Sequence, residues 1–133
     1  MDIILVEDDV PVRHSLKMLL TLCGHNVRDF GCSIEALLHP LRDQCLIADY
    51  LLPDLDGLEL IKRLRPLGWN GSGILITGYF DETLKVRAER VGYIGVYEKP
   101  ACFPELVKQV AHIATRKAEA QALSAKSRRP GPS

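Results

Sequence analysis

Four short runs rich in apolar residues and one alternating segment, "HNVRDF", each followed by a segment of helical periodicity, constrain this chain of 133 residues more than any other feature. Continuous runs such as "DIILV" and "CLIAD" are too short for helices and are typical of strands buried on both faces. Strands of this kind that alternate with helices form parallel sheets covered on both sides, with right-handed crossovers. The pattern therefore predicts an α/β fold with a doubly wound, five-stranded parallel sheet, whose strands cover residues 2–6, 25–30, 45–49, 71–77 and 93–98.

The segments that follow these runs place apolar residues at helical spacing, which predicts five helices. Residues that favour helix ends mark several of them. Asp9 precedes the first helix, Ser33 is the expected N-cap of the second, and Asp81 opens the fourth, which Gly92 closes. The predicted helices cover residues 11–22, 33–39, 58–65, 81–91 and 103–123.

The charge and length of the chain indicate one ordinary domain. Lys plus Arg and Asp plus Glu number 17 each, so the overall charge does not favour a nucleic-acid or membrane partner. No window approaches the run of about 18 apolar residues that a membrane-spanning helix needs. We expect a single domain over residues 1–120. Residues 121–133 are basic and have little to bury, and they are predicted to form a disordered tail.

Cysteine usage and the N-terminal residues favour a cytoplasmic protein. Cys23, Cys32, Cys45 and Cys102 show no Cys-x-x-Cys spacing and no His motif that would complete a zinc site. The start "MDIILVEDD" lacks the basic residues and the long apolar stretch of a signal peptide. We therefore expect reduced, structural cysteines in the cytoplasm.

Polar and charged residues stand where the predicted strands end. Glu7 and Asp8 follow the first strand, and Asp49 ends the third. Thr77 ends the fourth strand, and Lys99 follows the fifth. Parallel strands have their carboxyl ends at one edge of the sheet, and open α/β sheets bind ligands beyond that edge. Three carboxylates, a hydroxyl and an ammonium are therefore expected to meet in one cleft.

This group of side chains favours metal-assisted phosphoryl transfer. Two unit charges about 5 Å apart repel by roughly 3 kcal/mol at an effective dielectric constant of about 20, so the acids need a cation. Oxygen ligands without His or Cys favour Mg²⁺ or Mn²⁺, which bind carboxylates and phosphate oxygens together. Asp49 is then the candidate nucleophile that forms an acyl phosphate. Thr77 would hydrogen-bond the arriving phosphoryl group, and Lys99 would neutralise one of its oxygens.

Four stretches together resemble the receiver domain of two-component response regulators. They are "ILVEDD", "LIADYLLPDLDGLEL", "ILITG" and "YEKP", and they occur in the order and spacing of that family. The resemblance covers roughly residues 2–120. It implies a flavodoxin-like fold with strand order 2-1-3-4-5 and five helices.

The resemblance also implies a role for each residue at the strand ends. The carbonyl of Leu51 becomes a further metal ligand, and the metal is Mg²⁺ or Mn²⁺. The side-chain roles are Glu7 and Asp8 as the metal-binding acids, Asp49 as phosphoacceptor and metal ligand, Thr77 as switch hydroxyl and Lys99 as the family's lysine.

One position departs from the family pattern. Receiver domains usually carry a switch Tyr or Phe three residues before the lysine, where this chain has Val96. The aromatic residue, Tyr97, comes one place later. A shift by one residue turns a strand side chain to the opposite face of the sheet, so Tyr97 is not expected to move as the family's switch residue does.

The resemblance implies a signalling domain that catalyses only its own phosphorylation and dephosphorylation. A sensor histidine kinase would supply the phosphoryl group, and no DNA-binding module follows residue 120, so we expect a stand-alone receiver. Its output would pass to an unknown output protein or a phosphotransfer protein. A homodimer through the fourth helix, fifth strand and fifth helix is a further expectation.

Two other functions stay open at this point. One is a receiver-like interaction module that works without phosphorylation, which the displaced aromatic residue favours. The other is a Mg²⁺-dependent aspartyl phosphohydrolase. Such enzymes usually carry a second acid two residues after the nucleophile, where this chain has Leu51, and they usually add a cap domain, for which the chain is too short.

Overall fold

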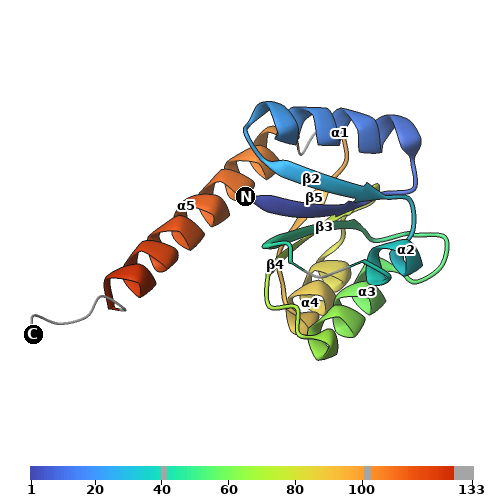
Figure 1. Ribbon diagram of the computed structural model, residues 1–133. Helices are drawn as coiled ribbons and strands as arrows, with labels where there is room; N and C mark the ends of the chain where they lie inside the picture. Colours follow the sequence, from blue (N-terminus) through green and yellow to red (C-terminus); the bar gives the residue numbers. More distant parts are fainter. Residues whose placement is uncertain (40–41, 101–102, 128–133) are drawn as a thin grey trace, which may run out of the picture.

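The computed structural model describes residues 1–39, 42–100 and 103–127, which form a three-layer α/β domain (Figure 1). Its central sheet has five parallel strands in the order β2-β1-β3-β4-β5, which confirms the predicted fold and strand order. The strands are β1 (Asp2–Val6), β2 (Asn26–Phe30), β3 (Cys45–Asp49), β4 (Ser72–Thr77) and β5 (Tyr93–Glu98).

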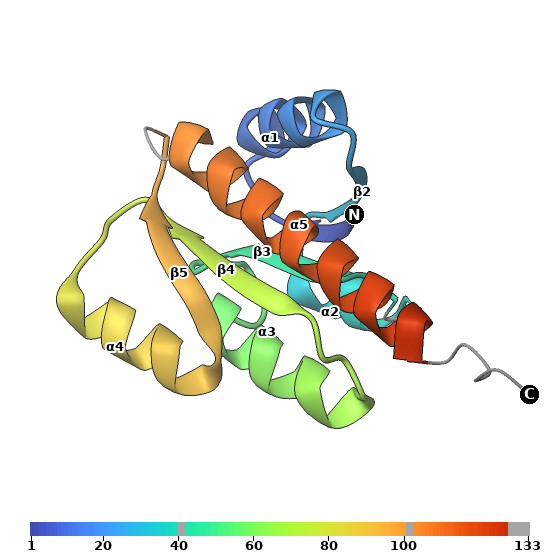
Figure 2. The ribbon, with the colours of Figure 1, turned by 90° about the vertical axis from the view of Figure 1, so that its left-hand side faces the viewer.

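Helices cover both faces of the sheet. Helices α1 and α5 lie on one face, and α2, α3 and α4 lie on the other (Figures 1 and 2). A short 3-10 helix, η1, continues α3. The bounds are α1 Val10–Leu22, α2 Ser33–Leu37, α3 Gly57–Leu64, η1 Arg65–Leu67, α4 Glu82–Val91 and α5 Phe103–Ser127.

The core consists of two apolar layers because side chains alternate along each strand. In β1, Ile3 and Leu5 pack toward α1 and α5, whereas Ile4 and Val6 pack toward the helices of the other face. Strand β3 at the centre of the sheet is buried at every position. A continuous apolar run is what a strand covered on both faces requires, and it brings Asp49 to the end of the best-buried strand.

Two predicted helix starts are confirmed. Asp9 is the N-cap of α1, and its Oδ1 accepts a hydrogen bond from Val12 N at 3.1 Å. Asp81 is the N-cap of α4 and accepts from Leu84 N at 2.7 Å. Gly92 ends α4 with a φ of 108°, a conformation that favours glycine. These short-range contacts fix where each helix begins and ends.

The predicted cap of α2 is wrong. Ser33 is the first helical residue, and the N-cap residue, Cys32, makes no side-chain capping bond. The cap comes instead from Asp54, whose carboxylate accepts from Ser33 N at 3.0 Å and from Ile34 N at 2.8 Å. Asp54 belongs to the loop between β3 and α3, so this contact ties that loop to α2.

The predicted tail begins too early. Helix α5 continues to Ser127, so residues 121–127 are helical, whereas residues 128–133 lie outside the described part of the chain. The helix packs through Leu106, Val110 and Ile113 and then runs past the edge of the sheet, as Figure 2 shows. The alanines in this part of the helix have the highest intrinsic helix propensity.

Candidate functional site

The acid pair Glu7-Asp8 lies in the turn between β1 and α1. The Glu7 side chain is 0% exposed, whereas Asp8 is exposed to solvent. Glu7 N donates to Phe30 O of β2 at 3.0 Å, which continues the parallel ladder one residue past the end of β1. A buried carboxylate at this point needs a compensating group, because burial of an unpaired charge is costly.

Lys99 supplies that compensation and joins the ends of three strands. Its Nζ lies 2.9 and 3.1 Å from the two carboxylate oxygens of Glu7, and 3.1 Å from Asp49 Oδ2. No described group donates a hydrogen bond to Asp49 Oδ1, and the side chain as a whole is 6% exposed. The predicted meeting of these three residues, which lie far apart in the chain, is confirmed.

Burial and charge shift the protonation of this cluster. Burial raises the pKa of Glu7 to about 7; the nearby Asp49 adds to the shift, and Lys99 opposes it. Burial would lower the pKa of the Lys99 ammonium, but its hydrogen bonds to Glu7 and Asp49 outweigh burial and raise that pKa. Lys99 therefore stays charged and holds the two acids together.

The acids fit a hard divalent cation. One oxygen each from Glu7, Asp8 and Asp49 can be chosen so that all lie within 4.8 Å of one another. An all-carboxylate donor set with one exposed member suits Mg²⁺ or Mn²⁺, which keep several waters. Leu51 lies two residues after Asp49 in the turn that follows β3, and the metal-binding role of its carbonyl stays a prediction.

Thr77 ends the neighbouring strand β4, but its hydroxyl is bonded elsewhere. Its Oγ1 lies 3.0 Å from Tyr79 O, to which it donates, and accepts from Tyr79 N at 3.2 Å. Beside it lies an open hollow of about 330 Å³ that Leu51 and Gly78 also line. A Cβ at Gly78 would meet no atom within 4 Å, so the space beside the Gly78 backbone is open.

The displaced aromatic residue lies on the face that strand alternation predicts. Val96 packs against the cluster of α3 and α4, whereas Tyr97 packs against the cluster of α1 and α5. The Tyr97 hydroxyl donates to Gln109 Oε1 of α5. The Tyr97 ring is therefore tied to α5, on the side of the sheet away from α4.

Two residues of the site were missed by sequence reasoning. Arg13 Nη1 donates to the Glu7 carbonyl at 2.8 Å. Gly57, the first residue of α3, lies so near the acceptor that an added Cβ would stand 2.6 Å from Asp49 O. The glycine that follows the "PDLD" turn was a usable signal, because only glycine allows such an approach. The contact of Arg13 carried no local sequence signal.

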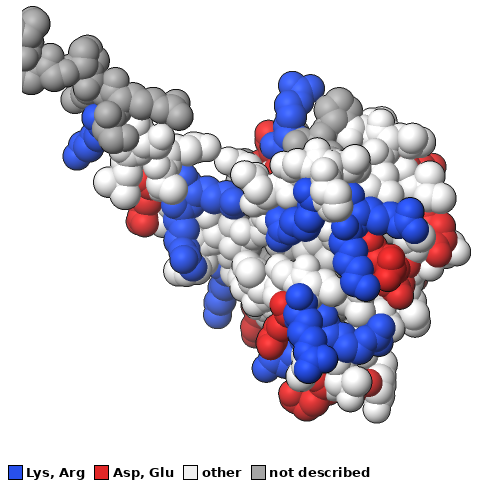
Figure 3. Space-filling view, turned by 90° about the horizontal axis from the view of Figure 1, so that it is seen from below, with Lys and Arg blue, Asp and Glu red and all other residues white. Residues whose placement is uncertain are grey.

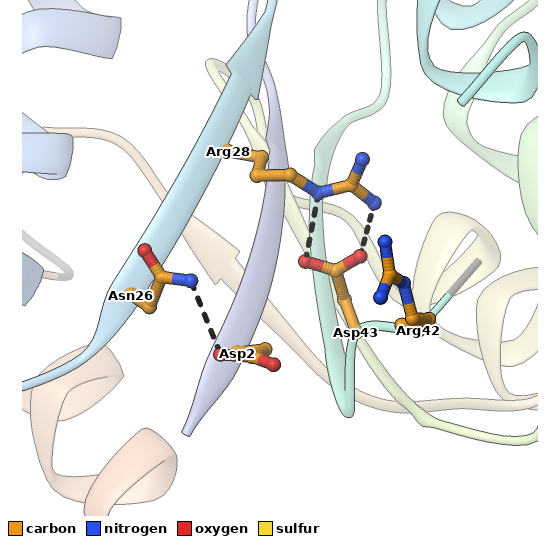
Figure 4. A pocket seen from close by; sticks show the side chains of 5 residues that line it. All are labelled: Asp2, Asn26, Arg28, Arg42 and Asp43. Carbon is orange, nitrogen blue, oxygen red and sulfur yellow. Dashed lines mark hydrogen bonds and ion pairs between the residues drawn. The ribbon is translucent and has the colours of Figure 1, made fainter. Parts of the chain in front are cut away.

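A second polar hollow, shown in Figure 4, lies at the opposite edge of the sheet and is built from paired groups. Arg28 forms a two-pronged ion pair with Asp43. Trp69 Nε1 donates to Asp43 O at 2.7 Å, and Asn26 donates to Asp2 at 3.3 Å. These contacts fasten the start of β3 to its surroundings, so we assign this hollow a structural role.

Figure 3 shows one face of the molecule, on which groups of Lys and Arg side chains stand beside Asp and Glu side chains. Within the described ranges, no helix combines the length and the apolar character needed to cross a bilayer.

Comparison with known proteins decides the family. The model of the response regulator receiver domain matches residues 3–111. This chain belongs to the response regulator receiver family. The transcriptional regulatory protein FixJ of Rhizobium meliloti (strain 1021) is 37% identical over 99 residues, which are 72% of this chain and 48% of FixJ. Nodulation protein W of Bradyrhizobium diazoefficiens is 36% identical over 110 residues, 81% of this chain and 48% of that protein.

A solved structure agrees on the receiver fold. The CheY-like receiver domain protein from Methanospirillum hungatei JF-1 superposes with a TM-score of 0.78 at 24% identity, covering 89% of this chain and 97% of that one. The chain spans about half the length of the two curated receiver relatives named above. The expectation that this receiver acts alone therefore stays a prediction.

Proposed function

We propose that this receiver domain accepts a phosphoryl group on Asp49 from a phosphohistidine of a sensor histidine kinase. The observation that carries the proposal is the Lys99 ammonium, which bridges Glu7 and Asp49 at 2.9 to 3.1 Å. The same ammonium that now binds the Asp49 carboxylate could bind an oxygen of a phosphoryl group attached to Asp49, and so stabilise its negative charge. Membership of the receiver family supports the same chemistry.

The proposed transfer conserves every atom. Asp49 Oδ1, to which no described group donates, attacks phosphorus, a P–O bond forms, and the P–N bond to the kinase histidine breaks. The imidazole leaves with the electron pair of the broken bond and takes up a proton. Dephosphorylation is the attack of water on the acyl phosphate, which releases inorganic phosphate and restores the carboxylate.

Glu7, Asp8 and Asp49, with the carbonyl of Leu51, are the residues that would hold Mg²⁺ or Mn²⁺. Bound there, the ion would offset the negative charge of the phosphoryl oxygens. The chain itself contributes the Lys99 ammonium, the fixed position of Asp49 at the end of β3, and a hydroxyl on Thr77. For Thr77 to donate to a phosphoryl oxygen, its hydroxyl must give up the hydrogen bond that it donates to Tyr79 O.

Exposed apolar side chains at the site support a protein partner as the phosphoryl donor. Val10, Leu51 and Tyr79 each stand two residues after a site residue and are 48%, 70% and 75% exposed. A kinase that delivers its histidine to Asp49 must cover this rim. After it leaves, Leu51 and Tyr79 would slow the approach of water, and an acyl phosphate that survives only seconds would count against that role.

The phosphorylated domain would act by contact with an output protein or by relay to a phosphotransfer protein. Phosphorylation adds about −1.5 to −2 charge and new acceptors, which can shift a two-state loop or helix. A homodimer through α4, β5 and α5 stays a prediction, and half-exposed Val86 and Ile94 are apolar side chains on that face. We place the reaction in the cytoplasm, where ATP is available to charge a kinase; Cys23, Cys32 and Cys45 are free thiols.

Beryllofluoride, an analogue of the phosphoryl group, tests the proposal in the full chain. In two-dimensional NMR, we expect beryllofluoride with Mg²⁺ to shift the amide signals around Asp49, Thr77 and Lys99 in the wild-type protein. The same addition should leave the Asp49→Asn variant unchanged, although its spectrum shows the same fold. Identical shifts in both proteins would contradict Asp49 as acceptor.

The two other functions predict different results. A module that works without phosphorylation would show no beryllofluoride response in the wild-type protein. A phosphohydrolase would turn over a small phosphomonoester in the presence of Mg²⁺, and we expect no turnover above background. Either contrary result would replace the proposed function.

A further inference from the structure

Glu7, whose carboxylate would bind the cation, has both of its flanking peptide groups held by hydrogen bonds. Its N–H donates to Phe30 O at 3.0 Å, and its carbonyl accepts from Arg13 Nη1 at 2.8 Å. Glu7 as a whole residue is 0% exposed, so without Arg13 its carbonyl would be a buried acceptor lacking a strong donor. This carbonyl belongs to the Glu7–Asp8 peptide, whose orientation sets how the Asp8 side chain leaves the backbone relative to that of Glu7.

Arg13 is itself held by an ion pair with Asp29. Its Nε lies 3.2 Å from Asp29 Oδ2 on β2, a charge contact without hydrogen-bond geometry, and the arginine side chain is 17% exposed. Lys17 binds the other oxygen of the same carboxylate at 2.7 Å. A Cβ at Gly31 would stand 3.0 Å from Arg13 Nη1, so the backbone after β2 leaves just enough room for the guanidinium.

We propose that Arg13 is a positioning residue for the divalent cation: it holds the Glu7–Asp8 peptide near Asp29 of β2 and so sets the spacing of Glu7 and Asp8 relative to Asp49. This inference rests on the proposed function, since it concerns the same cation site. Groups that orient metal ligands typically change metal affinity by about 10- to 100-fold when they are removed. A planar guanidinium reaches the carbonyl and the carboxylate together, which a lysine ammonium cannot do.

If only charge mattered, the loss of Arg13 would raise the affinity for a metal ion, whereas the positioning role predicts a lower affinity. The two explanations can therefore be told apart. Arg13 is a cation near a cation site, so its removal should favour a metal ion if only Coulomb forces counted. Arg13→Lys keeps the positive charge but loses the planar guanidinium with its several donors. Any change in metal affinity in this variant therefore comes from the lost geometry and not from charge. Lys17→Gln is the matched control, because it weakens the same Asp29 cluster without touching the Glu7 carbonyl.

The experiment is a Mn²⁺ titration of the full chain, followed by the electron paramagnetic resonance signal of the free ion. We expect Arg13→Lys to raise the dissociation constant about tenfold. Lys17→Gln should leave it within about twofold. Gly31→Ala should weaken binding in the same direction as Arg13→Lys, because its Cβ pushes against the guanidinium. Thermal unfolding of each variant measures the structural effect separately.

The outcomes separate this inference from the proposed function. If wild type and Arg13→Lys bind Mn²⁺ equally, Arg13 has no positioning role. The same conclusion follows if the Mn²⁺ affinities of the Arg13 and Lys17 variants fall in parallel with their thermal stabilities. In both cases the proposed function stands. If the wild-type protein binds no Mn²⁺, the proposed function is overturned, and this inference with it.

Discussion

At the scale of single residues, the carboxylates of Glu7, Asp8 and Asp49 repel one another, and a bound cation or a proton would reduce this repulsion. Lys99 compensates Glu7 and Asp49, whereas Asp8 has no ion-pair partner among the described residues. We predict that Asp8→Asn raises the free energy of unfolding without divalent ions by about 1 kcal/mol, because a like charge is removed. The stabilisation that Mg²⁺ gives the wild-type protein should be lost. Urea unfolding with and without Mg²⁺ measures both effects, and a variant that stays Mg²⁺-responsive would exclude Asp8 as a ligand.

Asp29 gives a pH-dependent prediction. Burial would raise its pKa, but the hydrogen bond from Lys17 and the charges of Lys17 and Arg13 outweigh burial and lower the pKa below the ordinary 3.8. A depressed folded-state pKa adds stability above pH 3.8, which is lost as pH falls through the folded-state value. Asp29→Asn should therefore be less stable than wild type at pH 6. The difference in the free energy of unfolding should shrink as the pH falls below 3.8 and through the folded-state pKa. A difference that stays constant down to pH 2 would show that charge is not its cause.

At the scale of elements, the approach of α3 to the end of β3 holds Asp49 in place. A Cβ at Gly57 would stand 2.6 Å from Asp49 O and 2.6 Å from Leu75 Cδ1. We predict that Gly57→Ala lowers the free energy of unfolding by about 2 kcal/mol, although helix propensity alone favours Ala. The control, Gly78→Ala, adds its Cβ to open space and should change stability little. Equal effects in the two variants would contradict the close contact.

The elements themselves were largely predictable, since their signals are local. Apolar runs and one alternating segment predicted the five strands, and residues such as Asp9 and Asp81 marked helix starts. Strand alternation predicted that Tyr97 lies on the face opposite that of Val96, but not that this face is the one α5 covers. The cap of α2 by Asp54 and the contact of Arg13 with Glu7 were not predictable, because each joins segments whose distance depends on the finished fold. The site could be inferred from what stands at the strand ends, but the bonding of Thr77 to Tyr79 could not.

At the scale of the whole molecule, the last part of α5 adds length but no core. Among the described residues, the last buried one is Ile113, and Leu123 is 68% exposed. A helix as short as the part of α5 beyond Ile113 would be marginally stable in water on its own. We predict that ending the chain after residue 120 changes the free energy of unfolding by less than about 0.5 kcal/mol. Urea unfolding checks this, and a larger loss would reveal packing, within one chain or between copies, that this part of α5 provides.

The central claim is that distant strand ends assemble an acceptor at Asp49, and chemical mapping tests it most directly. The full chain is incubated with Mg²⁺ and a small acyl phosphate donor, reduced with borohydride, which converts an aspartyl phosphate to homoserine, and sequenced by mass spectrometry. We expect Mg²⁺-dependent conversion at residue 49, strongly reduced in the Lys99→Ala variant. Conversion at Asp8 or elsewhere, or none at all in a protein that binds Mg²⁺, would contradict it.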